Sequence, residues 1–162
     1  MYFERQIHNL IKFITNVFVI TLFFGSPSFA ENVKGRVGIG IGYPYCSVKY
    51  GMASHWAGEL RSAFESNIFS LGGRVYYNFT PGMNLVLYSG LGADGLLFNT
   101  ENTSGDGTAV SCFAGFEYFL NRNLTLIFDI GPSYINVRDS VHPQNIAYNT
   151  EWIINLGLGW YY

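Results

Sequence analysis

The stretch Glu151–Tyr162 (EWIINLGLGWYY) decides the fold. From Trp152 onward, large apolar side chains alternate with a mostly small or polar set, and successive side chains of a β-strand point to opposite faces. One face therefore carries Trp152, Ile154, Leu156, Leu158, Trp160 and Tyr162. This face is too bulky for the interior of a small barrel, so the pattern predicts a barrel strand whose apolar face contacts lipid.

The end of this strand resembles the C-terminal β-signal of bacterial outer-membrane proteins. Asn155 is the polar residue, Gly157 follows two positions later, and Trp160 and Tyr162 are the aromatic third-last and last residues. The one departure is a final Tyr where Phe is commonest. The resemblance implies that the barrel-assembly machinery binds the C-terminal strand.

The beginning of the chain predicts a Sec-type signal peptide over residues 1–30. Arg5 and Lys12 precede an uncharged apolar run over residues 13–25, and Ser28-Phe29-Ala30 supplies small residues for a signal peptidase. A helix of this run spans only roughly 20 Å, whereas the hydrocarbon core of a membrane is roughly 30 Å thick. We therefore expect cleavage near Ala30 rather than a transmembrane anchor, and one mature domain over residues 31–162.

The composition points to a surface that does not face water. Charged residues are 12% of the chain, against a usual share of about 25%, and aromatic residues are 18%. After Ala30 no stretch approaches 18 continuous apolar residues, which excludes a helical membrane protein. A β-barrel satisfies both observations, because lipid requires every backbone polar group to be paired. The net charge of −2 and the pI near 5.8 argue against nucleic acid as a partner.

Alternating segments predict an all-β fold, an eight-stranded antiparallel up-and-down transmembrane β-barrel. An even count places both termini on the periplasmic side and the long connections, Thr100–Thr108 and Arg138–Thr150, outside. The turn at Pro44 is the weakest point, because a single bent strand there would reduce the count to seven. The expected strands are Lys34–Gly42, Cys46–Met52, Trp56–Glu65, Ile68–Phe79, Leu85–Asn99, Ala109–Leu120, Leu124–Val137 and residues 151–162.

The faces opposite the apolar ones carry the charged residues of the strands. Buried singly, each charge would cost several kcal/mol, so we expect an internal ion-pair network. The alternative is a soluble barrel with these charges on its outer face. Arg74 is expected to matter most, next to the space left by Gly72, with its partner left open among Glu117, Asp129, Glu59 and Asp94. The predicted network comprises Arg36, Lys49, Glu59, Arg61, Arg74, Asp94, Glu117, Asp129 and Glu151.

Aromatic residues gather near the expected strand ends, where amphipathic rings meet lipid headgroups. The expected periplasmic set is Tyr77, Phe79, Tyr118, Trp160 and Tyr162, and the expected outer set is Phe69, Phe98, Tyr134 and Trp152. The cysteines, Cys46 and Cys112, have lipid-facing parity on strands far apart in the ring, so we expect two unpaired thiols.

Together these features resemble the small OmpA/OmpX-type outer-membrane β-barrels. That family includes membrane anchors, adhesion and complement-resistance proteins and a few lipid-modifying enzymes, so the fold does not choose among them. We expect a monomeric, non-enzymatic barrel of the bacterial outer membrane with a plugged polar lumen, acting through its outer loops or by reinforcing the membrane. The alternatives are a lipid A or phospholipid modifying enzyme and a soluble periplasmic lipocalin-like carrier.

Candidate catalytic residues are sparse. Lipid A deacylases of this barrel size resemble one another in a His-x-Ser pair, in which the imidazole takes the proton of the Ser nucleophile. The nearest match here, Ser140-Val141-His142, is reversed and lies in an expected loop, where Glu101, Asp106 and Asp139 are the nearby carboxylates. No His/Cys cluster has metal-ligand spacing, so no metal or other cofactor is predicted.

Overall fold

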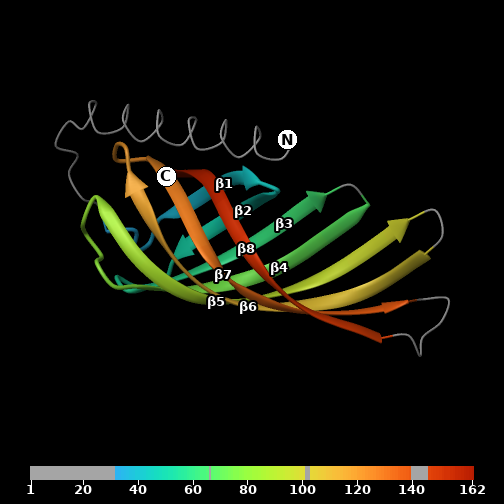
Figure 1. Cartoon of the computed structure of the whole chain (residues 1–162). Coiled ribbons are helices and arrows are strands. Elements are labelled where there is room, and N and C mark those ends of the chain that lie inside the picture. The colour runs from blue at the N-terminus through green and yellow to red at the C-terminus, as the bar shows by residue number, and fades with distance from the viewer. Residues whose placement is uncertain (1–31, 66, 101–102, 140–145) are drawn as a thin grey trace, which may run out of the picture.

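The computed structural model describes residues 32–65, 67–100, 103–139 and 146–162, which form one closed antiparallel barrel (Figure 1). Each strand pairs with its neighbours in chain order, and β8 closes the ring on β1. No helix among these residues is long and apolar enough to cross a membrane. The strands are β1 (Val37–Tyr43), β2 (Tyr45–Gly51), β3 (Trp56–Glu65), β4 (Ile68–Asn78), β5 (Leu85–Thr100), β6 (Thr103–Phe119), β7 (Leu124–Asp139) and β8 (Ile146–Tyr161).

The turn at Pro44 separates two strands rather than bending one. β1 and β2 pair in register from Val37↔Tyr50 to Ile41↔Cys46, and Pro44 lies between them without donating to a ladder. The prediction of eight antiparallel strands is therefore confirmed.

The two predicted long loops are shorter than expected, because residues assigned to them continue the strands. β6 begins at Thr103 and β8 at Ile146. A Cβ at Gly105 would lie 2.1 Å from Arg138 O, and one at Gly107 would lie 2.5 Å from Asn136 O. These glycines permit close backbone approach within a sheet, so this part of the predicted loop belongs to β6.

The outward and inward faces follow the predicted alternation. Large apolar side chains stand outward and exposed, with Leu60 71%, Leu91 66% and Trp152 71% exposed. Phe98 is the exception among the expected outer aromatics, because its ring approaches Gly105 on the inner face. Phe98 and Phe69 are both half-buried. The position of Phe98 in β5 is one residue out of phase with the outward Leu97.

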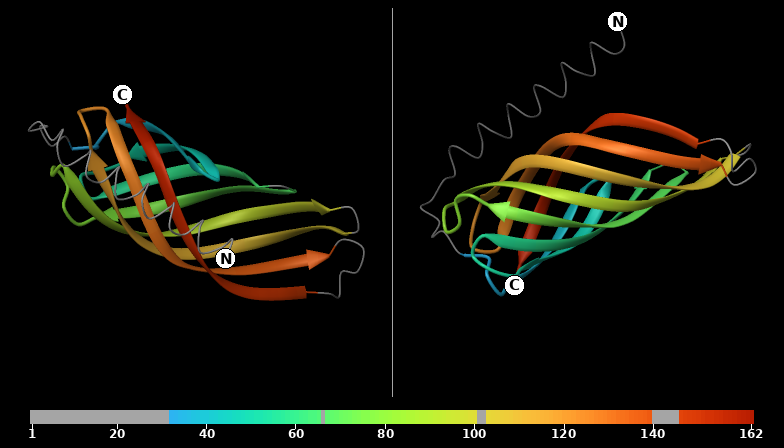
Figure 2. Two further views of the ribbon diagram at one scale, coloured as in Figure 1. Left: turned by 45° about the horizontal axis from the view of Figure 1, so that its top comes forward. Right: turned by 90° about the horizontal axis from the view of Figure 1, so that it is seen from below.

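The barrel wall has unequal height. β1 and β2 have 7 residues each, whereas β5 to β8 have 16 or 17 and extend beyond them (Figures 1 and 2). We call the side of these long hairpins the hairpin end and the opposite side, where Tyr162 lies, the terminal end. β8 pairs with β1 only over Leu156–Tyr161. Within the described residues, the rest of β8 therefore has β7 on one side and no strand on the other.

Candidate functional site

The interior of the barrel contains ion pairs between strands that are not neighbours. Lys49 on β2 places Nζ 2.8 Å from Glu117 Oε2 on β6. Arg61 on β3 donates from Nε to Asp94 Oδ1 on β5 at 3.2 Å. All four side chains are less than 10% exposed, so each charge depends on its partner for the interactions that water would otherwise supply.

Asp129 on β7 collects several donors at the middle of the barrel. Arg74 Nη1 on β4 lies 3.1 Å from each of its carboxylate oxygens. Asn155 Nδ2 donates to Oδ1 at 2.7 Å, and the Tyr88 hydroxyl lies 3.4 Å from Oδ2. Among the four partners left open for Arg74, the structure pairs it with Asp129.

Glu117 is the second acceptor of this kind. Besides Lys49, it accepts from the Thr125 hydroxyl at 2.9 Å and from the Tyr161 hydroxyl at 3.1 Å. Thr125 lies on β7, next to β6, and Tyr161 lies on β8, which closes the ring on β1. The carboxylate therefore connects the closing strand β8 to the centre of the barrel. Several donors to one carboxylate offset the cost of burying its charge.

Aromatic side chains complete the network, which was predicted from charged residues alone. Tyr76 donates its hydroxyl to Glu59, and Lys49 Nζ lies 4.3 Å from the centre of the Tyr76 ring. The Arg74 guanidinium lies 4.2 Å from the centre of the Phe113 ring. These rings have inward parity in their strands, and that was the signal by which the sequence could have identified them.

Two of the nine predicted network residues lie elsewhere. Arg36 is half-buried at the terminal end, where it donates to the Arg122 carbonyl at 2.9 Å and the Tyr161 carbonyl at 3.3 Å. Glu151 is exposed and accepts from Asn149 Nδ2 at 2.7 Å. Glu151 has inward parity, but β1 and β2 do not reach its level, so the opposite wall that would bury it is missing. The other seven are buried.

The space that Arg74 occupies comes from a different glycine than expected. A Cβ at Gly72 would lie 2.2 Å from Asp94 Oδ1, so Gly72 makes room for Asp94. Gly92 stands directly opposite Arg74, and a Cβ there would lie 3.2 Å from Arg74 Cγ and 2.7 Å from Ser111 Oγ. Gly92 is therefore the residue that accommodates the Arg74 side chain.

A small cavity lies among these side chains. A cavity of about 10 Å³ lies beside Ser47, Lys49, Glu59 and Tyr161. A cavity needs roughly 10–15 Å³ to hold one water molecule. This part of the interior is thus filled by protein atoms rather than by a continuous water column.

Some buried polar atoms have no hydrogen-bond partner within the described protein. They include Arg61 Nη1, Ser111 Oγ, Ser133 Oγ and Asn155 Oδ1. Buried polar groups are nearly always paired with protein, water or a ligand. These four atoms are therefore positions at which a ligand or ordered water would be stabilised.

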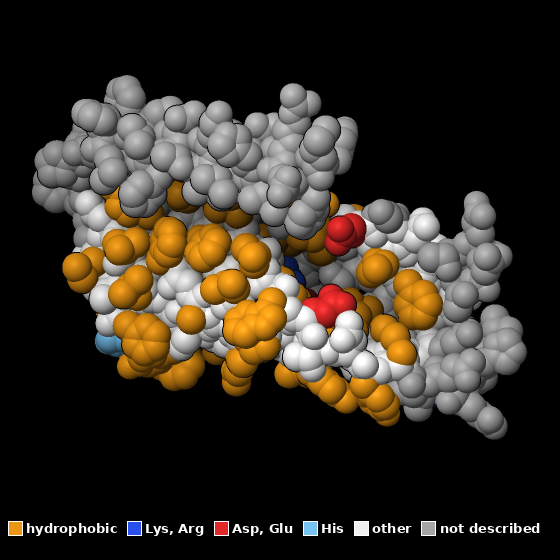
Figure 3. Space-filling view, in the orientation of Figure 1, with side chains coloured by type: hydrophobic (Ala, Val, Ile, Leu, Met, Phe, Trp, Pro, Cys, Tyr) orange, Lys and Arg blue, Asp and Glu red, His pale blue; other side chains and the backbone are white. Residues whose placement is uncertain are grey.

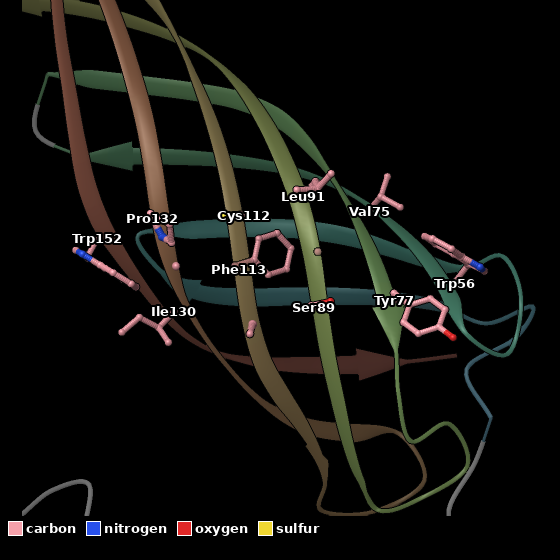
Figure 4. A pocket seen from close by; sticks show the side chains of 13 residues that line it. Trp56, Val75, Tyr77, Ser89, Leu91, Cys112, Phe113, Ile130, Pro132 and Trp152 are labelled. Carbon is pink, nitrogen blue, oxygen red and sulfur yellow. The ribbon is translucent and has the colours of Figure 1, made fainter.

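The outer surface has a shallow apolar groove of about 700 Å³ across β3 to β8. Trp56 and Trp152 stand at its two sides (Figure 4). Its floor is low because small residues face outward there. The β6–β7 ladder is interrupted between Ser111↔Ser133 and Ala114↔Ile130, where Pro132 lacks an N–H to donate. Cys112 lies in this groove and Cys46 on β2, and both are exposed free thiols, as predicted.

The four residues of the C-terminal motif divide between the two faces. Asn155 is buried against Asp129, and a Cβ at Gly157 would lie 2.6 Å from the Tyr45 hydroxyl. Trp160 and Tyr162 are exposed on the outer face.

Most of the candidate catalytic residues lie outside the described residues. This holds for Glu101 and for Ser140-Val141-His142. Asp106 is exposed on β6, and Asp139 ends β7. Across the described ranges, no group of three or more His, Cys, Asp or Glu side chains is arranged to hold a metal ion.

No protein-family model and no curated protein matches the chain. Among solved structures, it is similar to the N-terminal β-barrel domain of Pseudomonas aeruginosa OprF, with 15% sequence identity and a TM-score of 0.49. The alignment covers 78% of this chain and 94% of that domain. The strand pairing of the chain itself establishes the architecture, a closed eight-stranded antiparallel barrel like that implied by the resemblance to small OmpA/OmpX-type proteins.

Proposed function

We propose that the chain is a non-enzymatic barrel of the bacterial outer membrane, with a plugged polar lumen and an interaction surface at its hairpin end. The observation that carries this proposal is the inverted burial. Arg74, Glu117 and Asp129 are buried at 4%, 2% and 1% exposure, whereas Leu60 and Trp152 on the outer face are both 71% exposed. Water would penalise so much exposed apolar surface, and lipid would not.

The exposed apolar side chains form a belt around the barrel. On β8 the belt runs from Trp152 to Tyr162, and on the neighbouring β1 it includes Ile39 and Ile41. A strand tilted as in other barrels needs about 9–11 residues to cross a membrane, which this length supplies. The orientation that follows places the terminal end in the periplasm and the hairpin end outside.

The filled interior supports a role other than a pore. Eight strands enclose a space that side chains can fill, and here ion pairs and aromatic rings fill it. The long β5–β6 and β7–β8 hairpins extend beyond the belt, so they are the parts of the molecule that another cell-surface component would meet first. We propose that they carry the surface-interaction role.

Export and assembly complete the proposal. A signal peptide over residues 1–30 would direct the chain to the periplasm, and the barrel-assembly machinery would insert it as a monomer through the C-terminal strand. The test is fractionation of cells expressing the chain, with gel mobility before and after boiling. We expect a heat-modifiable band in the outer-membrane fraction; a band that stays soluble without detergent would instead support the periplasmic carrier.

The non-enzymatic part has its own test. Lipid A and phospholipid profiles are compared among cells without the protein, cells with the wild type and cells with His142→Ala. We expect the three profiles to be the same. A lipid change that needs His142 would overturn the proposal in favour of a lipid-modifying enzyme.

A further inference from the structure

β1 and β2 are too short to cross a membrane. Each has 7 residues, and Pro44 alone joins them, so this hairpin ends where its strands end. A residue rises roughly 3.3 Å along a strand and barrel strands tilt by about 35–45°, so such a strand spans roughly 17 Å of membrane thickness. The apolar band of an outer-membrane barrel is about 25 Å tall. The wall at β1 and β2 is therefore shorter than the hydrocarbon that would surround it.

The missing height lies at the hairpin end of the barrel. At the terminal end β1 and β8 are level, because Tyr162 N donates to Val37 O at 2.9 Å. At the hairpin end Tyr43, the last residue of β1, pairs with Leu156, while β8 continues for ten further residues to Ile146. The wall therefore has a step between β1 and β8, and the step faces the hairpin end.

Exposed aromatic side chains follow this step. Tyr43 stands at the tip of the β1–β2 hairpin and is 76% exposed, and Trp152, at the upper limit of the apolar belt on β8, is 71% exposed. Trp152 lies four residues beyond Leu156, the partner of Tyr43, which corresponds to roughly 9 Å of membrane thickness. Amphipathic rings prefer the level of the lipid head groups. The two aromatics therefore mark head-group levels of different height on the two walls.

The edge of β8 above the step requires polar surroundings. Tyr162 N donates to Val37 O, so the even-numbered residues of β8 direct their backbone groups toward β1. Trp152 and Ile154 lie past the end of β1, so within the described residues no strand pairs with their N–H and C=O groups on that side. Hydrocarbon cannot satisfy these groups, whereas water and head groups can. Figure 3 shows a hollow here with acidic side chains on its margin, which water also favours.

A bilayer responds to a short apolar wall by becoming thinner next to it. A bilayer of full thickness beside β1 would place hydrocarbon against the open edge of β8. A thinned bilayer would place head groups and water there instead. The short wall and the open edge therefore favour the same arrangement of lipid.

We propose that the barrel thins the bilayer beside β1 and β2, an inference that rests on the proposed outer-membrane location. The head groups there lie at the level of Tyr43, roughly 9 Å lower than beside β5 to β7, and they cover the open edge of β8. The partner of this surface is a lipid layer of reduced hydrocarbon thickness.

The chain has two natural positions for reporters of depth. Cys46 on β2 and Cys112 on β6 are exposed free thiols on the outer face. Cys46 lies five residues from Gly51, and Cys112 lies seven residues from Phe119, the residues that end β2 and β6 at the terminal end. Their heights above that end therefore differ by only roughly 5 Å. Toward the hairpin end, however, β6 continues for nine residues beyond Cys112, whereas β2 continues for one beyond Cys46.

The test places a nitroxide label on Cys46 in the Cys112→Ser chain and on Cys112 in the Cys46→Ser chain. Each refolded protein is reconstituted into vesicles of dilauroyl phosphatidylcholine, which has short acyl chains, or of dioleoyl phosphatidylcholine, which has longer ones. Collisions of the label with oxygen, which concentrates in hydrocarbon, and with a water-soluble nickel chelate give its depth. Heat-modifiable gel mobility checks that each labelled protein is folded.

In dioleoyl vesicles the Cys46 label is expected to lie roughly 5 Å closer to the head groups than the Cys112 label, because the wall beside Cys46 ends two residues away at Pro44. The Cys112 label should lie deeper in the dioleoyl than in the dilauroyl bilayer. The Cys46 label should keep its depth in both lipids. The Cys112 label is the matched control, since it reports the bilayer beside a wall of full height.

Equal depths for the two labels, or a Cys46 label that becomes deeper with chain length as the Cys112 label does, would overturn the proposal. A Cys46 label that meets neither oxygen nor the nickel chelate would also overturn it, because protein, such as a second copy of the chain, would then cover β2. Free collision of both labels with the nickel chelate in both lipids has a different meaning. The chain would then not be embedded in a membrane, and the proposed location would fail together with this inference.

Discussion

Arg74 on β4 reaches across the barrel to Asp129 on β7, and its Nη1 lies 3.1 Å from each carboxylate oxygen. The two residues are 4% and 1% exposed. Because Asn155 and Tyr88 approach the same carboxylate, Asp129 links three other strands at one point. We therefore expect that removing one partner of this pair costs more stability than removing both charges together.

We predict that Arg74→Met destabilises the barrel by roughly 3–5 kcal/mol, the usual effect of removing one partner of a buried pair. The free energy of unfolding is measured by urea titration of the refolded protein in detergent. Asp129→Asn in the same chain should recover much of the loss, because the orphaned charge is then removed. Asp94→Asn is the matched control and should show little coupling with Arg74→Met, since Asp94 pairs with Arg61. Coupling energies near zero for both carboxylates would contradict a buried Arg74–Asp129 pair.

The outward face of β8 can be tested by placing a charge at two heights. Leu156→Arg should cost roughly 2–4 kcal/mol if the side chain faces lipid near the bilayer midplane. Tyr148→Arg, also on an exposed outward position but beyond the belt, should cost less than about 1 kcal/mol. Both values come from equilibrium refolding into phospholipid vesicles. Equal costs at the two heights would argue against the proposed position of the membrane.

Gly92 should tolerate no side chain. We expect Gly92→Ala to destabilise the barrel by roughly 1–3 kcal/mol, because the added Cβ presses on Arg74 and Ser111. Gly95 lies on the same strand, and the nearest atom to a Cβ added there would be Leu71 O at 3.7 Å, so Gly95→Ala should be nearly neutral. The readout is again the free energy of unfolding. A neutral Gly92→Ala would mean that Arg74 can take another path through the interior.

The C-terminal motif makes a prediction about assembly in cells. Tyr162→Asp should leave the chain in the periplasm, where it is degraded, if the insertion machinery binds the terminal aromatic. Tyr148→Asp changes an exposed tyrosine of the same strand far from the terminus and should leave outer-membrane levels unchanged. Cell fractionation and immunoblotting measure both. Normal outer-membrane levels of the Tyr162→Asp protein would mean that assembly does not need the terminal aromatic.

The strands were predictable because each side chain reports its face locally. The strict alternation over Trp152–Tyr162 and the bounds of Trp56–Glu65 needed only a period of two. The lengths of β6 and β8 were not predictable in the same way. Gly105 and Gly107 look like loop residues until their cross-strand neighbours are known, because the reason for a small residue lies on another strand.

The interior shows the same limit. Parity placed Arg74 and Asp129 on the inward face, but choosing Asp129 over Glu117 required the shear between strands that are not neighbours. Glu151 shows the converse error: its parity was read correctly, but its burial depended on how far β1 and β2 extend. Pairwise register and wall height belong to the closed barrel and cannot be read from one strand.

The ladder between β1 and β8 carries a kinetic consequence. It joins the two ends of the described chain through only six residue pairs, from Gly38↔Tyr161 to Tyr43↔Leu156. The β5–β6 and β7–β8 ladders are longer and connect residues that are close in sequence. Local hairpins close at low entropic cost, whereas the end-to-end seam has the largest loop to close and only a short ladder to offset that cost. We therefore expect the β1–β8 seam to be the last part of the ring to form and the first to separate when the barrel unfolds.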